Sequence, residues 1–475
     1  MKKTDKILLV ILSLCLIIVI ISSLSYVFKG NHGLSWELFY EYADDIDVLF
    51  LGNSHAADYV PMELWEQYGV TSYNLASSGV PMPVTYWTLM NALDYASPKL
   101  VVLDCYALEH PDKTSSLAFT QAALDGFRLG PTKLKAVYDL STDNDEISEK
   151  DRLGLFWPFG SYHDRWKSLS YWDFNKTENY LLGSNYSIAI TPPAEAEPTD
   201  ECMPRDSVGV TYLYKIIEEC KARDINLLLV YAPFPAQRSK YMEANLMEEI
   251  AEECGVDCIN FLDMELVDFD IDCVDSNCHL NTSGIRKIEK YMFDFILANY
   301  DIADHRGDSR YACWDEMYER FMPIKSEILS VAETDALRLM LLHDATMSSC
   351  VYIPQGSVLY DDEQLIKLVK NIPTDATLTK LDGAKAERSE YLLVVDNLSG
   401  AIHEFTGDER IESLSCSLGT VDYIDSPDGR VLSIDGGENM LYRASDGEAL
   451  IVQGIVGYNG RAYDETLSWS SVKAS

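Results

Sequence analysis

The chain has 475 residues, and 47% of them are apolar, as expected of a globular protein with a full hydrophobic core. Its 38 basic and 76 acidic side chains give a formal net charge of −38 at pH 7. Nucleic-acid binding depends on cationic side chains that neutralise phosphates, so this charge argues against nucleic acid as a partner. The length indicates two or three domains in addition to any membrane segment.

The N-terminal segment has the pattern of a membrane anchor. Three lysines lie among the first six residues, and the uncharged apolar run Ile7 to Phe28 follows them, long enough to cross a bilayer as one helix. Because lysines that flank a span stay in the cytoplasm, the chain after Lys29 is expected outside the cell. A cleaved signal peptide is the alternative, but the run is longer than a signal core. The sequence therefore predicts that residues 1–30 are a cytoplasmic tip and a signal anchor of a single-pass cell-membrane protein.

After a short amphipathic helix over 36–42, the first strand pattern ends in a polar segment. Residues 48–51 form the apolar run of a strand that is covered on both faces of a parallel sheet. Gly52 permits a tight turn, and Asn53, Ser54 and His55 follow it. Ligands of open α/β sheets bind outside the carboxyl ends of the strands, so Ser54 is a candidate nucleophile. A strand-to-helix turn with Ser54 as N-cap is the alternative.

Helix and strand patterns alternate along the chain up to about residue 302. Helices are expected over 61–68, 85–95, 208–223, 241–254 and 285–300, and strands over 71–75, 100–103, 225–231 and 258–262. Alternation of this kind builds parallel βαβ units. With the first strand it predicts a three-layer α/β/α sandwich of about five parallel strands.

An insertion over about 106–202 interrupts this alternation. It is dense in aromatic residues, among which His163, Arg165 and Trp166 lie close together. Aromatic faces stack against sugar rings, so a glycan-binding lid is one interpretation. An insertion that packs a small core of its own is the other.

A second polar segment, from Asp275 to Gly284, lies on a loop that enters the last helix of the alternating region. A nucleophilic serine needs a base, and the base needs an acid that orients it. His279 can supply the base and Asp275 the acid, which predicts a Ser–His–Asp triad with Ser54. A polar loop with a capping aspartate is the alternative.

These motifs resemble those of the SGNH (GDSL-type) hydrolase superfamily, and most of all its membrane-anchored branch in Gram-positive bacteria. Gly52-Asn53-Ser54-His55 is similar to the first block, Asn74 to Gly79 to the second, and His279 to Gly284 to the last. Two features differ from the family pattern. The third block, Gly-x-Asn-Asp, is not recognisable after the strand at 100–104, and Asp275 lies four rather than three residues before His279. Asp272 is therefore an alternative acid.

The resemblance implies an SGNH-type, flavodoxin-like domain over 36–302 and an oxyanion hole. That hole would consist of the backbone N–H groups of Ser54 and Gly79, with a side-chain donor from Asn53. It further implies substrate contacts from His55 and from the His-x-Arg-Trp patch that contains His163 and Arg165. Neither a metal nor another cofactor is expected.

The activity that the resemblance implies is that of an extracellular serine acyl esterase or O-acyltransferase. Its substrate would be a cell-surface polysaccharide or a teichoic-type polymer that carries ester-linked acyl groups, and a membrane protein could donate the acyl group. The alternative is a catalytically inactive SGNH-fold protein that binds glycan or scaffolds polymer assembly.

The C-terminal third has a different pattern. Residues 303–335 predict a helical extension, and residues 336–475 predict a β-rich α+β accessory domain with one helix over 357–372. The chain has eleven cysteines, which are expected to be small buried residues for the most part. An exported location would also permit a disulfide between Cys273 and Cys278.

Overall fold

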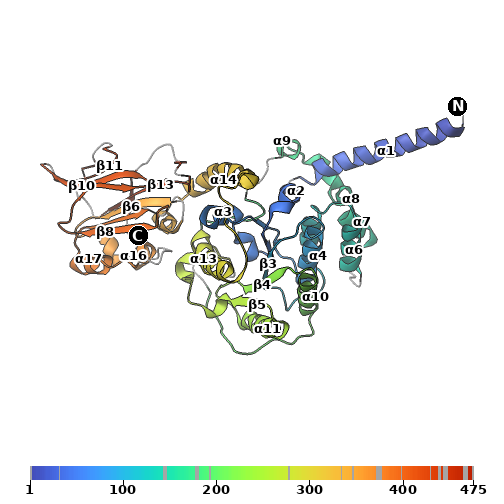
Figure 1. Ribbon diagram of the computed structural model, residues 1–475, viewed down its shortest axis with the longest axis horizontal. Helices are drawn as coiled ribbons and strands as arrows, with labels where there is room; N and C mark the ends of the chain where they lie inside the picture. Colours follow the sequence, from blue (N-terminus) through green and yellow to red (C-terminus); the bar gives the residue numbers. More distant parts are fainter. Residues whose placement is uncertain are drawn as a thin grey trace.

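A computed structural model gives the fold of the chain. It describes residues 3–30, 33–142, 147–176, 181–191, 194–275, 279–332, 334–344, 347–370, 377–396, 398–427, 429–436, 440–441, 448–459, 461–463 and 469–472. Three parts follow one another in Figure 1: a projecting N-terminal helix, an α/β domain, and a C-terminal region rich in strands.

The N-terminal helix α1 (Lys3–Phe28) projects away from the rest of the molecule (Figure 1). It is the one helix in the described part of the chain that is long and apolar enough to cross a membrane, and its apolar window is unburied. The predicted membrane helix is thereby confirmed in length and composition, while the side of the membrane on which the remainder lies stays a prediction.

The α/β domain contains a sheet of five strands, all parallel. The strands are β1 (Val48–Leu51), β2 (Ser72–Asn74), β3 (Leu100–Asp104), β4 (Asn226–Tyr231) and β5 (Asp257–Asn260). Their order is β2-β1-β3-β4-β5, so the chain reverses direction across the sheet between β1 and β3. The predicted parallel α/β sheet is confirmed.

Alternate residues of the sheet enter two apolar cores, one on each face. Leu49, Val101 and Leu229 pack in one core with α4 (Met82–Ala92), α10 (Val208–Ala222) and α11 (Arg238–Cys254). Phe50, Val102 and Leu228 pack in the other core with α13 (Thr282–Asn299) and with Leu64 of α3 (Pro61–Tyr68). This division follows from the two-residue period of a strand, and it gives the three-layer arrangement.

The short elements of the domain are α2 (Leu34–Tyr42), η1 (Ala43–Asp45), η2 (Ala56–Asp58), η4 (Phe261–Asp263) and α12 (Phe269–Asp272).

The insertion is helical and lies beside α1 and α4. Its elements are α5 (Leu117–Leu124), α6 (Pro131–Ser141), α7 (Glu149–Phe156), α8 (Pro158–Tyr162), η3 (His163–Lys167) and α9 (Tyr171–Phe174). Leu124, Ala136, Leu140 and Leu155 are buried in the core that α4 also enters, so the insertion extends that core and does not form a separate one. Several of its aromatic side chains are instead exposed.

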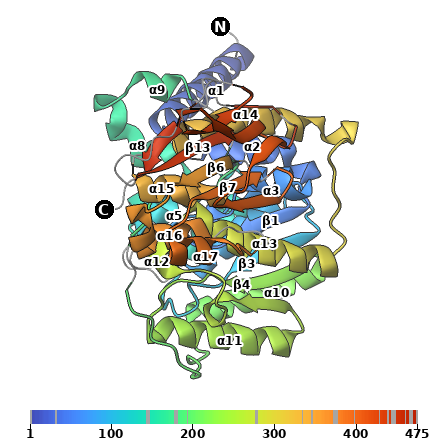
Figure 2. The same ribbon diagram turned by 90° about the vertical axis from the view of Figure 1, so that its left-hand side faces the viewer.

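The C-terminal region consists of η5 (Ser309–Tyr311), α14 (Ala312–Ser330) and a β-rich unit, which faces the viewer in Figure 2. One antiparallel sheet has the order β14-β13-β6-β7-β8, and a second has the order β12-β11-β10-β9. The first comprises β6 (Met347–Ile353), β7 (Tyr391–Asp396), β8 (Ala401–Thr406), β13 (Ala449–Ile455) and β14 (Trp469–Val472). The second comprises β9 (Ile411–Cys416), β10 (Gly419–Ser426), β11 (Gly429–Ile434) and β12 (Met440–Leu441). Side chains from both sheets share one small core.

The helices of this unit are α15 (Asp335–Met340), η6 (Leu341–His343), η7 (Val358–Asp361), α16 (Glu363–Lys370) and α17 (Leu381–Glu387). The predicted helix over 357–372 is thus a 3-10 turn followed by a shorter α-helix. The ten cysteines among the described residues are free thiols. Cys278, the predicted partner of Cys273, lies outside the described residues.

A buried ion network joins the C-terminal unit to the α/β domain. Lys325 Nζ on α14 lies 2.5 Å from Glu63 Oε1 on α3 and 2.9 Å from Asp344 Oδ1, and all three side chains are at most 1% exposed. Burial alone would lower the pKa of Lys325, but Asp344 and Glu63 raise it above its ordinary value. Removal of one member of such a group leaves buried charge without compensation.

Replacing Lys325 with methionine should therefore destabilise the protein by about 3–5 kcal/mol, because Glu63 loses the cation at 2.5 Å and Asp344 keeps the more distant Arg286, at 3.4 Å. The matched control is Lys380→Met, which removes an ion pair with Glu409 whose side chains are 39% and 45% exposed. Its cost should stay within about 1 kcal/mol. Urea denaturation of both variants measures the difference, and equal losses would contradict a structural role for the buried network.

Candidate active site

Ser54 lies in a turn at the carboxyl end of β1. Gly52 adopts a φ of 140°, and a Cβ at this position would lie 2.8 Å from Cβ of Asp104 at the end of β3. Only glycine permits this close approach of the two strand ends. The Asn53 side chain then accepts a hydrogen bond from the His55 backbone N–H at 3.0 Å, which closes the turn. Ser54 is the partly exposed residue of this otherwise buried segment.

His279 and Asp275 form a hydrogen-bonded pair. Nδ1 of His279 lies 2.5 Å from Oδ2 of Asp275, and the His279 backbone N–H donates to Oδ1 of the same carboxylate at 3.4 Å. Asp272, the alternative acid, is fully buried and accepts hydrogen bonds from Ser283 Oγ at 2.7 Å and Lys287 Nζ at 2.6 Å. The structure therefore favours Asp275 over Asp272 as the carboxylate that orients His279.

The backbone of this loop is held on both sides of the histidine. Cys273 pairs with Leu280 as an antiparallel bridge, and the Val274 N–H donates to the His279 carbonyl at 3.0 Å. Asn281 then caps α13, since its side chain accepts from the Gly284 N–H and its amide donates to the Ile271 carbonyl at 2.7 Å. The imidazole is consequently presented by a short β-bridge that leads directly into a helix.

An aromatic stack brings the two halves of the site together. The rings of His279 and His55, the residue that follows Ser54, have centroids 5.3 Å apart at an interplanar angle of 30°. The ring of His55 also stacks on Tyr106 at 4.2 Å and contacts Phe234 at 5.0 Å. Tyr106 follows β3 and Phe234 follows β4, so three strand ends and the His279 loop meet at one place. This is the edge at which open α/β sheets bind ligands.

The loop after β2 approaches the same edge. Asn74 is buried, and its amide donates to the carbonyls of Ala56 and Tyr59 at 2.7 and 2.9 Å, which ties β2 to the segment after Ser54. The Ser77 N–H donates to the Gly52 carbonyl at 3.2 Å. Gly79 is exposed with a φ of 67°, and a Cβ there would meet the ring of Phe119 on α5. The backbone of the predicted oxyanion loop is thus fixed against the Ser54 turn.

Two buried carboxyls near the site have raised pKa values. Burial raises the pKa of Asp58 to about 7, against the opposing effect of His279 and of a hydrogen bond from Asn185. Burial likewise raises the pKa of Asp104 to about 7, although the backbone N–H groups of Tyr106 and Ala232 and the nearby Lys240 oppose it. Perturbed pKa values of this kind are common at functional sites.

A lysine lies at the far end of the aromatic stack. Lys240 Nζ is 4.3 Å from the centroid of the Tyr106 ring, on which His55 also packs. The ammonium pairs with Glu109 and Glu243 at 2.5 and 2.7 Å. A cation on a tyrosine ring is stabilised by the ring quadrupole, so Lys240 holds Tyr106 in place.

The predicted substrate contacts differ from what the structure shows. His55 is 3% exposed and enclosed by aromatic rings, so it supports the site from within and is not open to substrate. Arg165 donates to the Phe28 carbonyl at 2.6 Å and to Asp173 at 2.6 Å, and His163 packs near Phe159. These contacts place Arg165 and His163 at the end of α1. The types and spacing of these residues in the sequence gave no indication that Arg165 would donate a hydrogen bond to a backbone carbonyl of α1.

Asp58, Asp104, Tyr106 and Lys240 are the site residues that the sequence motifs did not indicate. Asp104 and Tyr106 could have been suspected, because they follow a buried strand just as Ser54 does. Asp58 lies in a 3-10 turn and Lys240 in an ordinary amphipathic helix. The sequence around these two residues does not distinguish them from charged residues on the surface.

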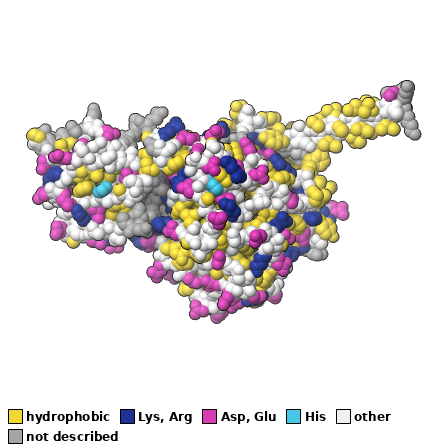
Figure 3. All heavy atoms as spheres, viewed as in Figure 1, with side chains coloured by type: hydrophobic (Ala, Val, Ile, Leu, Met, Phe, Trp, Pro, Cys, Tyr) yellow, Lys and Arg dark blue, Asp and Glu magenta, His cyan; other side chains and the backbone are white. Residues whose placement is uncertain are grey.

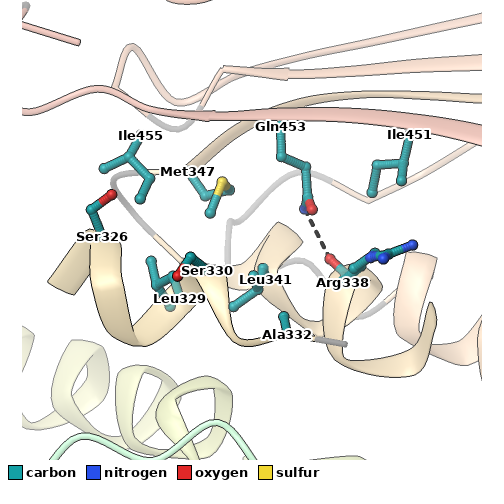
Figure 4. A pocket seen from close by; sticks show the side chains of 10 residues that line it. All are labelled: Ser326, Leu329, Ser330, Ala332, Arg338, Leu341, Met347, Ile451, Gln453 and Ile455. Atoms are coloured by element: carbon teal, nitrogen blue, oxygen red, sulfur yellow. Dashed lines mark hydrogen bonds between the residues drawn. The ribbon is translucent and has the colours of Figure 1, made fainter. Parts of the chain in front are cut away.

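The described cavities lie elsewhere or at the margin of the site. A cavity of about 170 Å³ lies between α14, α15 and the first C-terminal sheet, and Gln453 closes one side by donating to the Arg338 carbonyl (Figure 4). A small one beside Asp58, Asn185 and Thr282 lies behind the His279 loop. Among the described residues, no cluster of three or more His, Cys, Asp or Glu side chains could hold a metal ion.

A comparison of the chain with models of known protein families finds no match, and a comparison with curated proteins finds none either. The resemblance to the SGNH hydrolases therefore stays a prediction from the sequence motifs. The geometry described above is that of the residues in these motifs.

The buried imidazole of His55 leads to a prediction for the dependence of stability on pH. Burial, with His279 and Lys240 nearby, lowers the pKa of His55 to about 3 from its ordinary value of 6.5. Between pH 6.5 and pH 3 the unfolded chain binds a proton at His55 that the folded chain excludes. The contribution of neutral His55 to the free energy of unfolding is therefore complete above pH 6.5 and is lost as the pH falls.

Phenylalanine fits the same aromatic surroundings and does not titrate. Replacing His55 with phenylalanine should therefore remove this loss of stability at low pH. From pH 7 to pH 5 the stability of the variant relative to the wild type should rise by about 2 kcal/mol. Urea denaturation at pH 7, 6 and 5 measures the difference. If stability depends on pH in the same way in both proteins, His55 binds a proton as readily in the folded state as in the unfolded state, and the prediction is wrong.

Proposed function

We propose that the chain is a serine acyl esterase or O-acyltransferase that acts outside the cytoplasmic membrane. Ser54 would be the nucleophile, His279 the base and Asp275 the orienting acid. The observation that carries the proposal is the 2.5 Å hydrogen bond between His279 and Asp275, in a loop whose imidazole packs on the residue next to Ser54. Serine, histidine and carboxylate in these roles are the requirements for acyl transfer through a covalent intermediate.

In the first half of the reaction, Ser54 Oγ attacks the carbonyl carbon of an ester while His279 Nε2 takes the hydroxyl proton. The tetrahedral intermediate collapses when the C–O bond to the leaving alcohol breaks, and His279 returns the proton to that alcohol. The acyl group is then bound to Ser54. Asp275 keeps the proton of the neutral imidazole on Nδ1, so that Nε2 is free to accept, and it stabilises the imidazolium that forms.

In the second half, an acceptor hydroxyl attacks the acyl carbon while His279 takes its proton. The bond between the acyl group and Ser54 Oγ then breaks, and His279 returns the proton to Ser54. Water as acceptor makes the reaction a hydrolysis, and a sugar or polymer hydroxyl makes it a transfer. The backbone N–H groups of Ser54 and Gly79 would hold the oxyanion in both halves, with the Asn53 amide as a further donor. Loss of one such donor costs about 3 kcal/mol in other enzymes. The loop contacts at Asn74 and Ser77 support this arrangement, because they fix the two backbone segments to each other.

The substrate class follows from the resemblance and from the anchor. A cell-surface polysaccharide or a teichoic-type polymer with ester-linked acyl groups would meet a domain that α1 holds at the membrane. A membrane protein that supplies the acyl group would be the partner of a transferase.

Labelling with a fluorophosphonate probe tests the nucleophile. Full-length wild-type protein in membranes should be labelled at Ser54 and should hydrolyse a generic acetyl ester, whereas Ser54→Ala should do neither. If the folded wild type reacts with neither reagent, the proposal fails in favour of an inactive SGNH-fold protein that binds glycan or scaffolds polymer assembly.

The role of Asp275 has a separate test. Asp275→Asn should lower kcat/KM for the acetyl ester by roughly 10⁴-fold, because the amide favours the wrong tautomer of His279. Asp301→Asn, an exposed substitution beyond the end of α13, is the matched control and should retain wild-type activity. An equally active Asp275→Asn variant would remove Asp275 from the mechanism.

A further inference from the structure

The insertion carries the most exposed large apolar side chains of the described chain outside α1. Seven of them are more than 60% exposed, and all seven lie between residues 129 and 174: Leu129, Tyr138, Leu153, Trp166, Tyr171, Trp172 and Phe174. We refer to them as the apolar insertion surface. The surfaces of soluble monomeric proteins seldom concentrate large apolar side chains in this way unless a partner or a membrane covers them.

Four of these side chains lie on η3 and α9, and both elements contact the end of α1. The rings of Phe28 and Phe159 stack at 6.0 Å, and Arg165 Nη1 donates to the Phe28 carbonyl at 2.6 Å. Lys176 Nζ donates to the Tyr26 carbonyl at 2.6 Å and lies 3.6 Å from the centroid of the Tyr26 ring. In Figure 3 the apolar side chains of α1 continue onto the part of the globule at its base. The last turn of α1 is therefore fixed to the insertion and is not joined to it by a loose linker.

The charge of this part of the chain differs from that of the whole. Residues 128–176 contain eight basic and eight acidic side chains, whereas the complete chain has a net charge of −38. An anionic membrane surface would repel most of the protein but not this segment. Arg165, Lys167 and Lys176 lie among the exposed aromatic residues, as basic and aromatic side chains do at membrane interfaces.

We propose that the apolar insertion surface binds the interfacial layer of the same bilayer that α1 spans. Tryptophan and tyrosine favour this layer, where the ring is in contact with apolar groups and the polar edge stays hydrated. Because α1 is fixed to the insertion, a spanning α1 brings the surface to the lipid without any rearrangement. Anchor and surface together would hold the domain in one orientation.

The same insertion reaches the rim of the candidate active site. Ser115 donates to the Gly79 carbonyl, and Phe119 on α5 covers Gly79. From α5, Gln121 accepts from Ser161 at 2.9 Å and Asp125 accepts from Tyr162 at 2.6 Å, which connects α5 to α8 beside the anchor. Docking on the bilayer would therefore restrain the insertion that supports the loop of Gly79.

Fluorescence quenching by lipid tests the proposal on the full-length protein. Wild type and a Trp166→Phe/Trp172→Phe variant are placed in nanodiscs of phosphatidylcholine and phosphatidylglycerol, with or without a doxyl group near the headgroup. Both tryptophans are 62% exposed, so phenylalanine should be tolerated. The wild type should be quenched by the doxyl lipid, and the variant should lose most of that quenching.

The matched control is Trp36→Phe/Trp87→Phe, which replaces two buried tryptophans of the α/β domain and should leave the quenched component unchanged. Equal quenching of the wild type and the Trp166→Phe/Trp172→Phe variant would show that these two side chains do not contact the lipid, and it would overturn the proposal. Since the readout needs no substrate, it is independent of the proposed acyl transfer.

Discussion

The position of the His279 imidazole is the constraint on which the candidate site depends. Asp275 holds Nδ1 by a hydrogen bond, and His55 packs against the ring face. His55 is in turn enclosed by Tyr106 and Phe234, which come from the ends of two other strands. Residues at three strand ends of the parallel sheet thus build the wall against which the His279 ring packs, and one of these strand ends also carries Ser54.

The C-terminal unit is bound to the same loop from two directions. Tyr186 donates to Asp344 at 2.5 Å and accepts from Thr282, which lies three residues after His279. On the other side, Lys367 of α16 pairs with Asp268, the N-cap of α12, at 2.6 Å and with Asp270 of α12 at 2.9 Å, just before the Asp275 segment. These contacts give the unit a structural connection to the candidate site, although its sheets contribute no side chain to the triad.

The insertion makes a comparable connection between the anchor and the opposite side of the site. It is fixed to the last turn of α1 by Arg165 and Lys176, and it reaches Gly79 through α5. Arg165, which the sequence predicted as a substrate contact, donates here to a carbonyl at the end of α1. Helix α1, the insertion and the second loop of the site consequently form one continuous structure.

Much of the fold could be predicted from the sequence. The strand over Val48–Leu51 and the helix over Pro61–Tyr68 were predicted with the bounds that the structure has, because buried apolar runs, proline and glycine act locally. Ser54, His279 and Asp275 could be singled out for the same reason, since each lies where a strand or a loop ends. The sequence did not indicate the features that need a partner distant in the chain: the surroundings of His55, the acceptors of Arg165, and the buried network of Lys325.

The sequence by itself determined the alternation of strands and helices in the α/β domain outside the insertion, the membrane-length helix and the candidate nucleophile, all of which depend on neighbouring residues. Only the tertiary structure decided which carboxylate forms a hydrogen bond with the His279 ring, that His55 is buried, and that Arg165 lies at the end of α1. These outcomes depend on which side chains meet across the sheet and between domains. The pairing of a charge is set by burial and by distances across the fold, and neither quantity is encoded in a short stretch of chain.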